Sequence, residues 1–547
     1  QMLEEWISFR QTTVQRRSQF RLDKVLARIH ILEGRQLVLL NIDEVIRIIR
    51  NSDEPKPALI ARFKLTERQA DDILDIRLRQ LARLEAIKIE QELKELREEQ
   101  AKLEDIVGNP SALRRLMVKE IEADAKQFAD ERRTLIKTGA VAVAAPALLG
   151  ANSASAQGRV IKIGHVSPRT GPLAGFGEAD NFIIEQVRGI LKDGLQSGGR
   201  TYQVQIISKD SQSTGTRAAE VANDLILSDK VDLLVAAGTP DTTNPVSDQA
   251  EVNEVPCVTT NCPWQPYFFG RKGDPAKGFN WTYHFFWGLE DVIAAFLALW
   301  DQAPTNKVVG GLFPNDADGN AWGDKERGLP PALAAAGYKL HDPGRYQVMN
   351  NDFSSQIAAF KAAGAEIVTG NMIPPDFATF WSQCAQQGFK PKVVTIGKAL
   401  LFPSVINSLG ARGNGLTSEV WWTPSHPFKS GLTGQSAAQL AKAYEDATKR
   451  PWSQPIGFQH ALFEVAIDVL KRTKSLEPKA ILESIIATNY QSMVGPVQWT
   501  GKPVKNVTKT PLVAGQWQRK GDKFELVITS NKPAPNIPTG GKLELLS

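Results

Sequence analysis

The segment that most constrains the fold is residues 132–157, RRTLIKTGAVAVAAPALLGANSASAQ, which lies far from either end of the chain. It begins with Arg132 and Arg133, continues as an apolar run over 139–149, and ends in small residues at 154–156. This is the order of a secretory signal, and the apolar run is too short to span a bilayer as a helix, which takes about 20 residues. Such a signal belongs at an N-terminus, so it divides this chain into two parts.

Two finer interpretations of this segment are open. The paired arginines, followed by Leu135, Ile136 and Lys137, resemble a twin-arginine export signal. The alternative is a buried, alanine-rich helix within one continuous protein. We favour the signal because the composition changes abruptly on its two sides.

The amino-acid composition differs between the two sides of this segment. Residues 1–133 hold 51 of the 125 charged residues, but only 2 of the 42 glycines, 3 of the 32 prolines and 1 of the 12 tryptophans. Long charged helices are typical of the first composition, and a globular domain rich in turns is typical of the second. We therefore expect an all-α region over 1–131, the signal-like segment over 132–156 and an α/β region over 157–547. The arrangement indicates two joined coding units, whether by nature, engineering or gene assignment.

The totals argue against several classes of function. A net charge of +5 over 547 residues is small, so charge predicts no nucleic-acid partner. Cys257, Cys262 and Cys384 form no CxxC motif and allow at most one disulfide, and the six histidines do not cluster. We expect no metal and no cofactor. The chain also has no GxSxG, P-loop, HExxH or GxGxxG motif, so we expect no enzyme activity.

The N-terminal part predicts several amphipathic helices. Residues 22–32 and 42–49 have helical periodicity, and 51–55 (NSDEP) mark a loop between helices. Thr66 and Gln69 have the spacing of a capping box and predict the start of another helix.

A heptad seam with one polar interruption follows. Its members alternate steps of four and three: Ile89, Leu93, Leu96, Gln100, Leu103 and Val107. This pattern is typical of a coiled coil. Residues 108–110 (GNP) end the seam, and 112–128 predict a helix that could return antiparallel.

Four strings carry a family resemblance over nearly all of residues 1–134. They are RIHILEG (28–34), NIDEVIRIIRNSDEPKPAL (41–59), LTERQADDILDIRLRQLARLE (65–85) and DERRT (130–134). They resemble the C-gate region in the A subunit of bacterial type IIA topoisomerases, topoisomerase IV more than DNA gyrase. The resemblance implies a coiled-coil arm that ends in a dimer contact, and hence a homodimer through residues 1–131.

A departure from that family limits what this part can do. The family's catalytic tyrosine lies in a domain that precedes this region, and residues 1–131 contain no tyrosine. We therefore expect no DNA cleavage and no DNA contact from these residues. A non-catalytic topoisomerase fragment that acts as a dimerisation element is the alternative function for the chain.

Residues 157–547 alternate apolar strands with amphipathic helices. Strands are predicted at 160–166, 202–208, 231–237, 307–313, 366–369 and 393–397, with helices at 182–195, 216–227 and 353–363. This alternation indicates parallel sheets covered on both faces. Because the pattern restarts near Lys307, we expect two lobes, one from 157–286 and 424–495 and the other from 287–423 and 496–547.

A second resemblance covers this whole part. Its strings are SPRTGPLAGFGEA (167–179), GTPDTTNPVSD (238–248), VPCVTTNCPW (255–264), WGD (322–324), DFSSQIAAFKAAGAEIV (352–368) and MVGPVQWTGKP (493–503). They resemble the type I periplasmic solute-binding proteins of branched-chain amino-acid transporters. The resemblance implies the substrate-binding component of an ABC transporter, with an inner-membrane permease as partner. It implies a periplasmic location after signal cleavage, or a cytoplasmic one if the signal is masked. A sensory binding protein on the same fold is a further alternative.

Ligands of such two-lobed proteins bind between the lobes, at the carboxyl ends of the strands. Thr239 and Thr242 offer hydroxyls at a helix start, where the family binds a carboxylate, although helix capping explains them equally well. The resemblance places Asn261 and Pro263 among the residues that contact ligand. Trp287 and Trp322 are candidates for an aromatic wall, with burial in the core as the alternative.

Two departures bear on the ligand. The family holds the ligand ammonium with an acid just after the strand at 393–397, where this chain has Lys398. An aligned tyrosine is replaced by Met372. We therefore expect a small carboxylate, either amino acid-like or an aromatic acid and not a simple α-amino acid, with Arg169 or Lys398 as a second anion contact. A solvated surface lysine is the alternative for Lys398.

Overall fold

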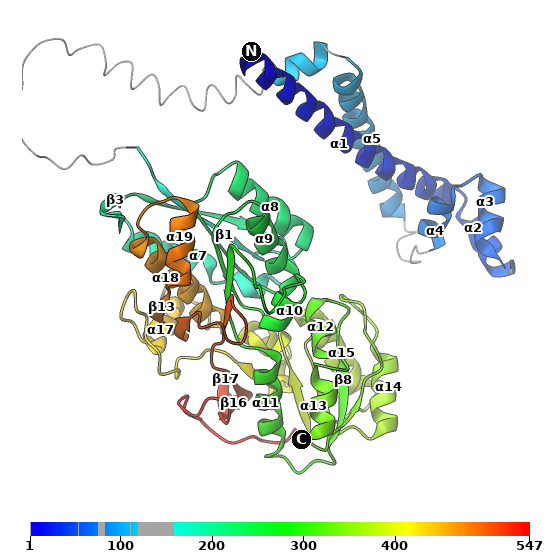
Figure 1. Ribbon diagram of the computed structural model, residues 1–547. Coiled ribbons are helices and arrows are strands. Elements are labelled where there is room, and N and C mark those ends of the chain that lie inside the picture. The colour runs from blue at the N-terminus through cyan, green and yellow to red at the C-terminus, as the bar shows by residue number, and fades with distance from the viewer. Residues whose placement is uncertain (1, 53, 75–82, 110, 119–157, 547) are drawn as a thin grey trace, which may run out of the picture. The chain divides into compact units, whose positions relative to one another are not determined.

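The computed structural model describes residues 2–52, 54–74, 83–109, 111–118 and 158–546. They belong to two compact units, residues 1–151 and residues 152–547, and each is described by itself (Figure 1). The signal-like segment, the DERRT string and most of the helix predicted at 112–128 lie outside the described residues. Within those ranges no helix is long and apolar enough to cross a membrane.

Two long helices, α1 (Met2–Leu40) and α5 (Arg83–Gly108), lie along each other in the first unit (Figure 1). The predicted seam makes this contact, because Leu93 and Leu103 are buried against α1 and Leu96 and Val107 pack beside them. The α1 side of the contact consists of Leu22, Val25, Ile29 and Leu32. The heptad pattern therefore joins two segments of the same chain.

Among the described residues between α1 and α5 lie the short helices α2 (Ile42–Asn51), α3 (Pro55–Phe63) and α4 (Glu67–Leu74). The predicted capping box is present at the start of α4. Thr66 N–H donates to Gln69 Oε1 at 3.0 Å, and Gln69 N–H donates to Thr66 Oγ1 at 3.3 Å. Arg35 of α1 donates to both carboxylate oxygens of Asp72, at 2.7 and 2.8 Å, and so anchors α4 on α1.

The second unit contains two large sheets, of which the first has the strand order β4-β1-β5-β6-β7-β15. All of its pairs are parallel. The strands are β1 (Ile161–Ser167), β4 (Val204–Asp210), β5 (Leu233–Ala237), β6 (Cys257–Thr260), β7 (Thr282–Phe285) and β15 (Val507–Thr508). The central strand β5 is buried along its whole length, as apolar strands are when both faces of a parallel sheet are covered.

Helices α8 and α9 pack together on one face of this sheet, and α7 and α18 pack on the other (Figure 1). The helices of this lobe are α7 (Asp180–Ile190), α8 (Gly215–Leu227), α9 (Pro240–Val252), α10 (Trp264–Phe268), α17 (Ala437–Thr448), α18 (Pro455–Arg472) and α19 (Pro478–Ile486). A 3-10 turn, η2 (Ala174–Gly177), follows β1. The helix predicted through Leu195 ends at Ile190, because Leu195–Ser197 form β2, in a hairpin with β3 (Arg200–Tyr202).

The second sheet has the order β17-β16-β12-β11-β10-β8-β9. Its strands are β8 (Val308–Leu312), β9 (Lys339–His341), β10 (Ile367–Gly370), β11 (Val393–Ile396), β12 (Thr417–Val420), β16 (Val513–Lys520) and β17 (Lys523–Ser530). The five strands β8–β12 are parallel and repeat the order of the first sheet, whereas β16 and β17 are antiparallel additions.

The helices of the second lobe include α12, which contributes to the candidate site. They are α11 (Leu289–Trp300), α12 (Ala317–Trp322), α13 (Leu329–Ala335), α14 (Ser354–Ala363), α15 (Pro374–Gln386) and α16 (Pro403–Ser408), with 3-10 turns η3 (Ala399–Leu401) and η4 (Gly410–Gly413).

The chain crosses between the lobes three times, after β7, after β12 and after β15. The last crossing differs from the predicted boundary at residue 496. A hairpin of β13 (Asn489–Ser492) and β14 (Gly495–Gln498) comes first, and β15 then pairs with β7 in the first sheet. The return to the second lobe therefore lies after Thr508.

Candidate functional site

A small cavity lies between the lobes, where the parallel strands of both sheets end. Its lining comes from η2, from the segments after β5, β6 and β7, from α12, and from the segments around β11 and β12. The cavity has a volume of about 20 Å³, and its lining residues are Phe176, Thr239, Asn261, Pro263, Phe286, Trp287, Asp318, Trp322, Lys398, Glu419 and Trp421. This is where the topology of open α/β sheets places ligands.

The structure brings six of the predicted residues together at this cavity. They are Thr239, Asn261, Pro263, Trp287, Trp322 and Lys398. Three others lie elsewhere. Met372 is fully buried in the core of the second lobe. The Thr242 hydroxyl is engaged within the protein, because it donates to the Thr239 carbonyl at 3.2 Å. Arg169 lies in the loop after β1, where its backbone N–H donates to Asp210 Oδ1 at 2.9 Å.

Thr239 and Asn261 provide buried polar atoms at the first-lobe side. Thr239 is the residue that precedes α9, and its Oγ1 is buried without a hydrogen-bond partner among the described residues. Asn261 follows β6 with φ +75°, in the left-handed region, and neither polar atom of its buried side chain has a partner there. Buried polar groups in native proteins are nearly always hydrogen-bonded, so these atoms indicate a ligand or bound water.

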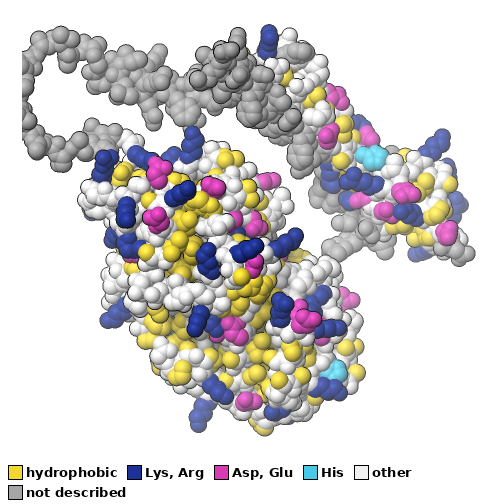
Figure 2. Space-filling model, in the orientation of Figure 1, with side chains coloured by type: hydrophobic (Ala, Val, Ile, Leu, Met, Phe, Trp, Pro, Cys, Tyr) yellow, Lys and Arg dark blue, Asp and Glu magenta, His cyan; other side chains and the backbone are white. Residues whose placement is uncertain are grey.

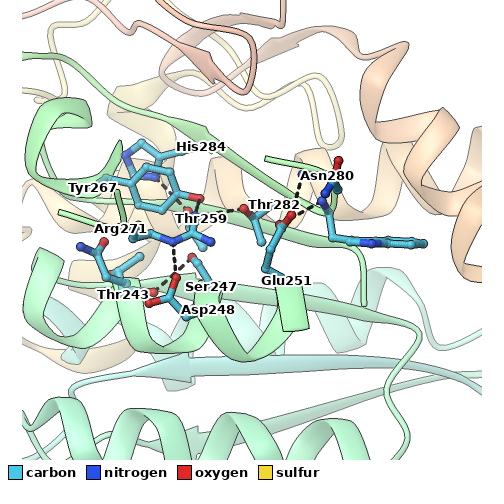
Figure 3. Close-up of polar contacts among 12 residues, drawn as sticks. Thr243, Ser247, Asp248, Glu251, Thr259, Tyr267, Arg271, Asn280, Thr282 and His284 are labelled. Carbon is cyan, nitrogen blue, oxygen red and sulfur yellow. Dashed lines mark hydrogen bonds and ion pairs between the residues drawn. The ribbon is translucent and has the colours of Figure 1, made fainter. Parts of the chain in front are cut away.

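A buried histidine holds the loop that carries Asn261 (Figure 3). His284 of β7 lies 2.8 Å from the Cys262 carbonyl through Nε2 and 2.9 Å from Thr259 Oγ1 through Nδ1. Its ring stacks on Tyr267 with centroids 4.1 Å apart. Burial lowers the pKa of His284 to about 3, so the ring is neutral and its Nε2–H donates to the carbonyl. This contact fixes the backbone beside Asn261.

The same region contains a buried arginine that ties α9 to the segment after α10 (Figure 3). Arg271 donates to Asp248 Oδ1 at 2.7 Å, to the Tyr267 hydroxyl at 2.7 Å and to Thr282 Oγ1 at 3.0 Å. Its guanidinium also lies 3.9 Å from the centroid of the Phe279 ring. These contacts brace the first-lobe side of the cavity without lining it.

Aromatic rings form a wall at the crossings between the lobes. Phe286 and Trp287 have centroids 4.8 Å apart, and Trp421, from the second crossing, meets Phe286 edge-on at 4.9 Å. Trp322 comes from α12 and packs on Phe296 at 5.9 Å. The indole N–H groups of Trp287 and Trp322 are buried and have no acceptor within the described part of the chain. The two tryptophans therefore add hydrogen-bond donors as well as apolar surface.

Lys398 lies in the cavity but is not a free cation. Its Nζ is 3.0 Å from Asp316 Oδ2 and 2.9 Å from Asp318 Oδ2, and the residue is 7% exposed. Burial lowers the pKa of this ammonium, but the charges of Asp316, Asp318 and Asp241 outweigh burial and raise the pKa above its ordinary value. Lys398 is therefore neither the solvated surface lysine nor an unpaired receptor for an anion.

Two acids that the sequence interpretation missed also line the cavity. Glu419 accepts the Lys398 backbone N–H at 3.2 Å through Oε1 and the Ser418 hydroxyl at 2.9 Å through Oε2, and burial raises its pKa to about 7. Burial raises the pKa of Asp318 as well, although the Lys398 ammonium opposes the rise. Asp318 follows Asp316 by two residues at the start of α12. This spacing of two acids is the sequence signal by which Asp318 could have been found.

The described residues give no support for a metal site, a disulfide or a nucleic-acid interface. None of their His, Cys, Asp and Glu side chains are grouped to hold a metal ion. Cys257, Cys262 and Cys384 are buried free thiols. On the visible face of the described residues, lysine and arginine are interspersed with acids and form no continuous basic field (Figure 2).

Residues 160–522 match the family described as periplasmic binding protein. The chain belongs to this family. The family consists of ligand-binding proteins, in keeping with the fold and the cavity. Family membership and fold were both expected from the strings quoted above.

Solved structures of periplasmic binding proteins are similar to the second unit. A leucine binding protein of Thermotoga maritima has a TM-score of 0.54 at 19% identity, over 68% of this chain and 99% of that one. A solute binding protein of an ABC transporter from Rhodopseudomonas palustris BisB5, in complex with 3,4-dihydroxybenzoic acid, gives 0.55 at 16% identity, over 68% and 96%. A branched-chain amino acid binding protein of Streptococcus pneumoniae, in complex with isoleucine, gives 0.54 at 14% identity, over 68% and 100%. At these identities the likeness shows the fold alone.

The first unit is similar to a different protein. Residues 1–122 match the family described as the A subunit of DNA gyrase/topoisomerase IV. The A subunit of DNA topoisomerase 4 from Neisseria gonorrhoeae is 58% identical over 142 residues, which are 26% of this chain and 18% of that protein. The Escherichia coli K12 protein is 52% identical over 134 residues, or 24% and 18%. This chain spans less than a fifth of the length of these relatives, and dimerisation through residues 1–131 stays a prediction.

Proposed function

We propose that the second unit is the substrate-binding component of an ABC transporter and binds a small carboxylate-bearing solute between its lobes. The observation that carries this proposal is a set of buried hydrogen-bond donors in the cavity that lack acceptors among the described residues. The donors belong to Thr239, Asn261, Trp287, Trp322 and Trp421. A carboxylate offers two oxygens that can accept several such bonds, and it can be held in this way without a cation.

The setting of these donors also favours a carboxylate. Thr239 stands at the start of α9, a helix of 13 residues, and the N-terminus of a helix is favourable for negative charge. The wall of Phe286, Trp287 and Trp421 supports an apolar or aromatic remainder of the ligand. We propose that the protein closes on this solute in the periplasm and delivers it to an inner-membrane permease. The family resemblance supports both the location and the partner.

Isothermal titration calorimetry on the full chain tests this function. The ligands are L-leucine, L-phenylalanine, 4-methylpentanoate, 3-phenylpropanoate, benzoate and 4-hydroxybenzoate, together with leucinamide as a probe without a carboxylate. We expect binding of at least one carboxylate and about tenfold weaker binding of its amide, because a charge-assisted hydrogen bond is lost. Equal binding of acid and amide would show that the carboxylate is not recognised.

A pair of tryptophan variants localises the site. Trp287→Phe keeps an aromatic ring but removes the indole N–H, so we expect about a fivefold to tenfold loss of affinity for the carboxylate that binds. Trp499→Phe is the matched control, because the Trp499 indole N–H also lacks an acceptor among the described residues but lies outside the cavity. Equal effects of the two substitutions would place the site elsewhere.

A further inference from the structure

A second cavity is lined by the second lobe alone. Its volume is about 400 Å³, within the range of about 300–1,000 Å³ that is usual for small-molecule sites. It shares no described lining residue with the cavity between the lobes. The lining comes from α15 and the segment after it, from the region of η4 and from the end of the described chain. Its residues are Trp381, Cys384, Ala385, Phe389, Lys390, Pro391, Lys392, Ala411, Arg412, Asn414, Leu545 and Leu546.

The floor of this second cavity is apolar. Cys384, Phe389 and Pro391 are all buried. Trp381 of α15 adds an indole ring, whose N–H donates to the Arg412 carbonyl at 2.9 Å. Because that N–H is already engaged, the ring offers a ligand apolar surface and no hydrogen bond.

Leu545 and Leu546 are held beside the cavity by backbone hydrogen bonds of their segment. The Leu546 N–H donates to the Lys392 carbonyl at 2.9 Å. The Gln516 side chain of β16 accepts the Glu544 N–H at 2.9 Å and donates to the Glu544 carbonyl at 2.7 Å. The two leucines are therefore a fixed part of the lining and extend its apolar surface.

The charged side chains of the second cavity are all basic. They belong to Lys390, Lys392 and Arg412, and the described lining contains no acid. Lys392 is compensated, because its Nζ lies 2.8 Å from Glu366 Oε1. Lys390 and Arg412 are exposed and have no ion pair within the part of the chain that the structure describes. Arg412 donates once to the Trp381 carbonyl, at 3.3 Å, and retains further N–H donors.

We propose that this second cavity binds a small amphipathic anion, a molecule with one anionic head and an apolar body, such as a medium-chain carboxylate. The body packs against Trp381, Phe389 and the two leucines, and the head lies at Lys390 and Arg412. Two uncompensated cations beside an apolar floor are complementary to such a molecule, and hydrogen bonds between charged groups are the strong ones. The inference goes beyond the proposed function and does not depend on it, because the two cavities have separate linings.

Three probes with the same alkyl chain test the charge preference by titration calorimetry on the full chain. They are octanoate, 1-octanol and octylammonium, which carry an anionic, a neutral and a cationic head. We expect octanoate to bind about tenfold more tightly than 1-octanol, and octylammonium to bind more weakly than both. Equal or tighter binding of 1-octanol or octylammonium would overturn the inference, and so would a failure of octanoate to bind.

A double variant tests the two cations. Lys390→Gln with Arg412→Gln should weaken octanoate binding by about tenfold and change 1-octanol binding by less than about twofold. The matched control is Arg200→Gln with Lys479→Gln, which removes two exposed basic side chains outside the cavity. Equal losses in both double variants would show that net charge, and not this cavity, attracts the anion.

A filling substitution locates the apolar body while keeping every charge. Ala385 is an exposed residue of α15 in the lining, so Ala385→Phe should weaken both octanoate and 1-octanol by about tenfold or more. Ala362→Phe, at an exposed position of α14 outside the lining, is the control. Trp287→Phe alters only the cavity between the lobes and should leave octanoate binding unchanged. An ineffective Ala385→Phe, or an equal loss in Trp287→Phe, would place octanoate elsewhere and overturn the inference.

Discussion

Glu464 is a single buried acid whose protonation influences the stability of the fold. It lies on α18 with no exposed surface, and its carboxylate accepts the backbone N–H groups of Met493 at 2.8 Å and Leu432 at 3.3 Å. Burial raises its pKa from 4.5 to about 7, although the hydrogen bonds to it act in the opposite direction. Because the native state holds this proton more tightly than the unfolded chain, protonation stabilises the fold below pH 4.5. That stabilisation is lost as the pH rises through 7.

The substitution Glu464→Gln removes this titration. We expect the stability of the wild type relative to the variant to fall by about 2–3 kcal/mol between pH 5 and pH 8. Urea denaturation of both proteins at the two pH values measures this difference. The exposed Glu483→Gln on the neighbouring helix is the control and should show no such change. A stability difference that is the same at both pH values would contradict the assignment.

Single residues also show where sequence reasoning stops. Lys398 was expected to attract an anion because no acid stands beside it in the sequence. The acids that neutralise it belong to α12, far away along the chain, and only the fold brings them together. Trp421 and Asp318 were missed for the same reason. Thr239 was found as a hydroxyl at a helix start shortly after an apolar strand, and Asn261 was found through the family resemblance. Both lie where the carboxyl ends of the strands meet at one edge of the sheet.

Among the helices, α9 and α12 meet across the cleft from opposite lobes. Asp241 near the start of α9 accepts the Ala317 N–H at the start of α12 at 3.4 Å. Asp241 is an exposed residue, but the partial desolvation of its carboxyl raises its pKa, although the Lys398 charge lowers it. This contact exists only while the lobes are together, so it contributes to the closed form and not to the folding of either lobe.

Asp241→Ala should therefore shift the protein toward an open form. We expect ligand affinity to fall by about threefold to tenfold, because a smaller fraction of the protein is closed. Small-angle X-ray scattering of the ligand-free variant should give a larger radius of gyration than the wild type. The exposed Asp193→Ala is the control. An unchanged radius together with unchanged affinity would show that this contact does not influence closure.

The strands and helices were predictable in part. Strands β1, β5, β8 and β11 are apolar runs because helices cover both faces of each sheet, and the capping box marks the start of α4. The crossing near residue 496 was misplaced because β15 has two residues and therefore no periodicity of its own. Its place is decided by pairing with β7, a distant segment.

The molecule as a whole combines two compact units with unrelated similarities. The core of the first unit includes the α1–α5 seam and the contacts among α1–α4, and the core of the second consists of two large sheets with their helices. Separate cores predict separate unfolding transitions, since cooperativity extends over one core and not across a chain.

Leu93→Ala tests that independence. Leu93 is 2% exposed in the α1–α5 contact, so the cavity left by the substitution should destabilise the first unit by about 2–4 kcal/mol. Circular dichroism during heating should show an earlier helical transition, while the transition of the second unit and its ligand affinity stay unchanged. A simultaneous shift of both transitions would contradict the independence of the two cores.

A crystal structure of the full chain with the tightest-binding carboxylate would decide whether the cavity between the lobes is the binding site. We predict that the carboxylate lies within hydrogen-bond distance of Thr239 and Asn261, between the indoles of Trp287 and Trp322. A ligand bound outside this cavity would contradict the proposed function. A ligand carboxylate held in the cavity by Lys398, after displacing Asp316 and Asp318, would contradict the predicted contacts with Thr239 and Asn261.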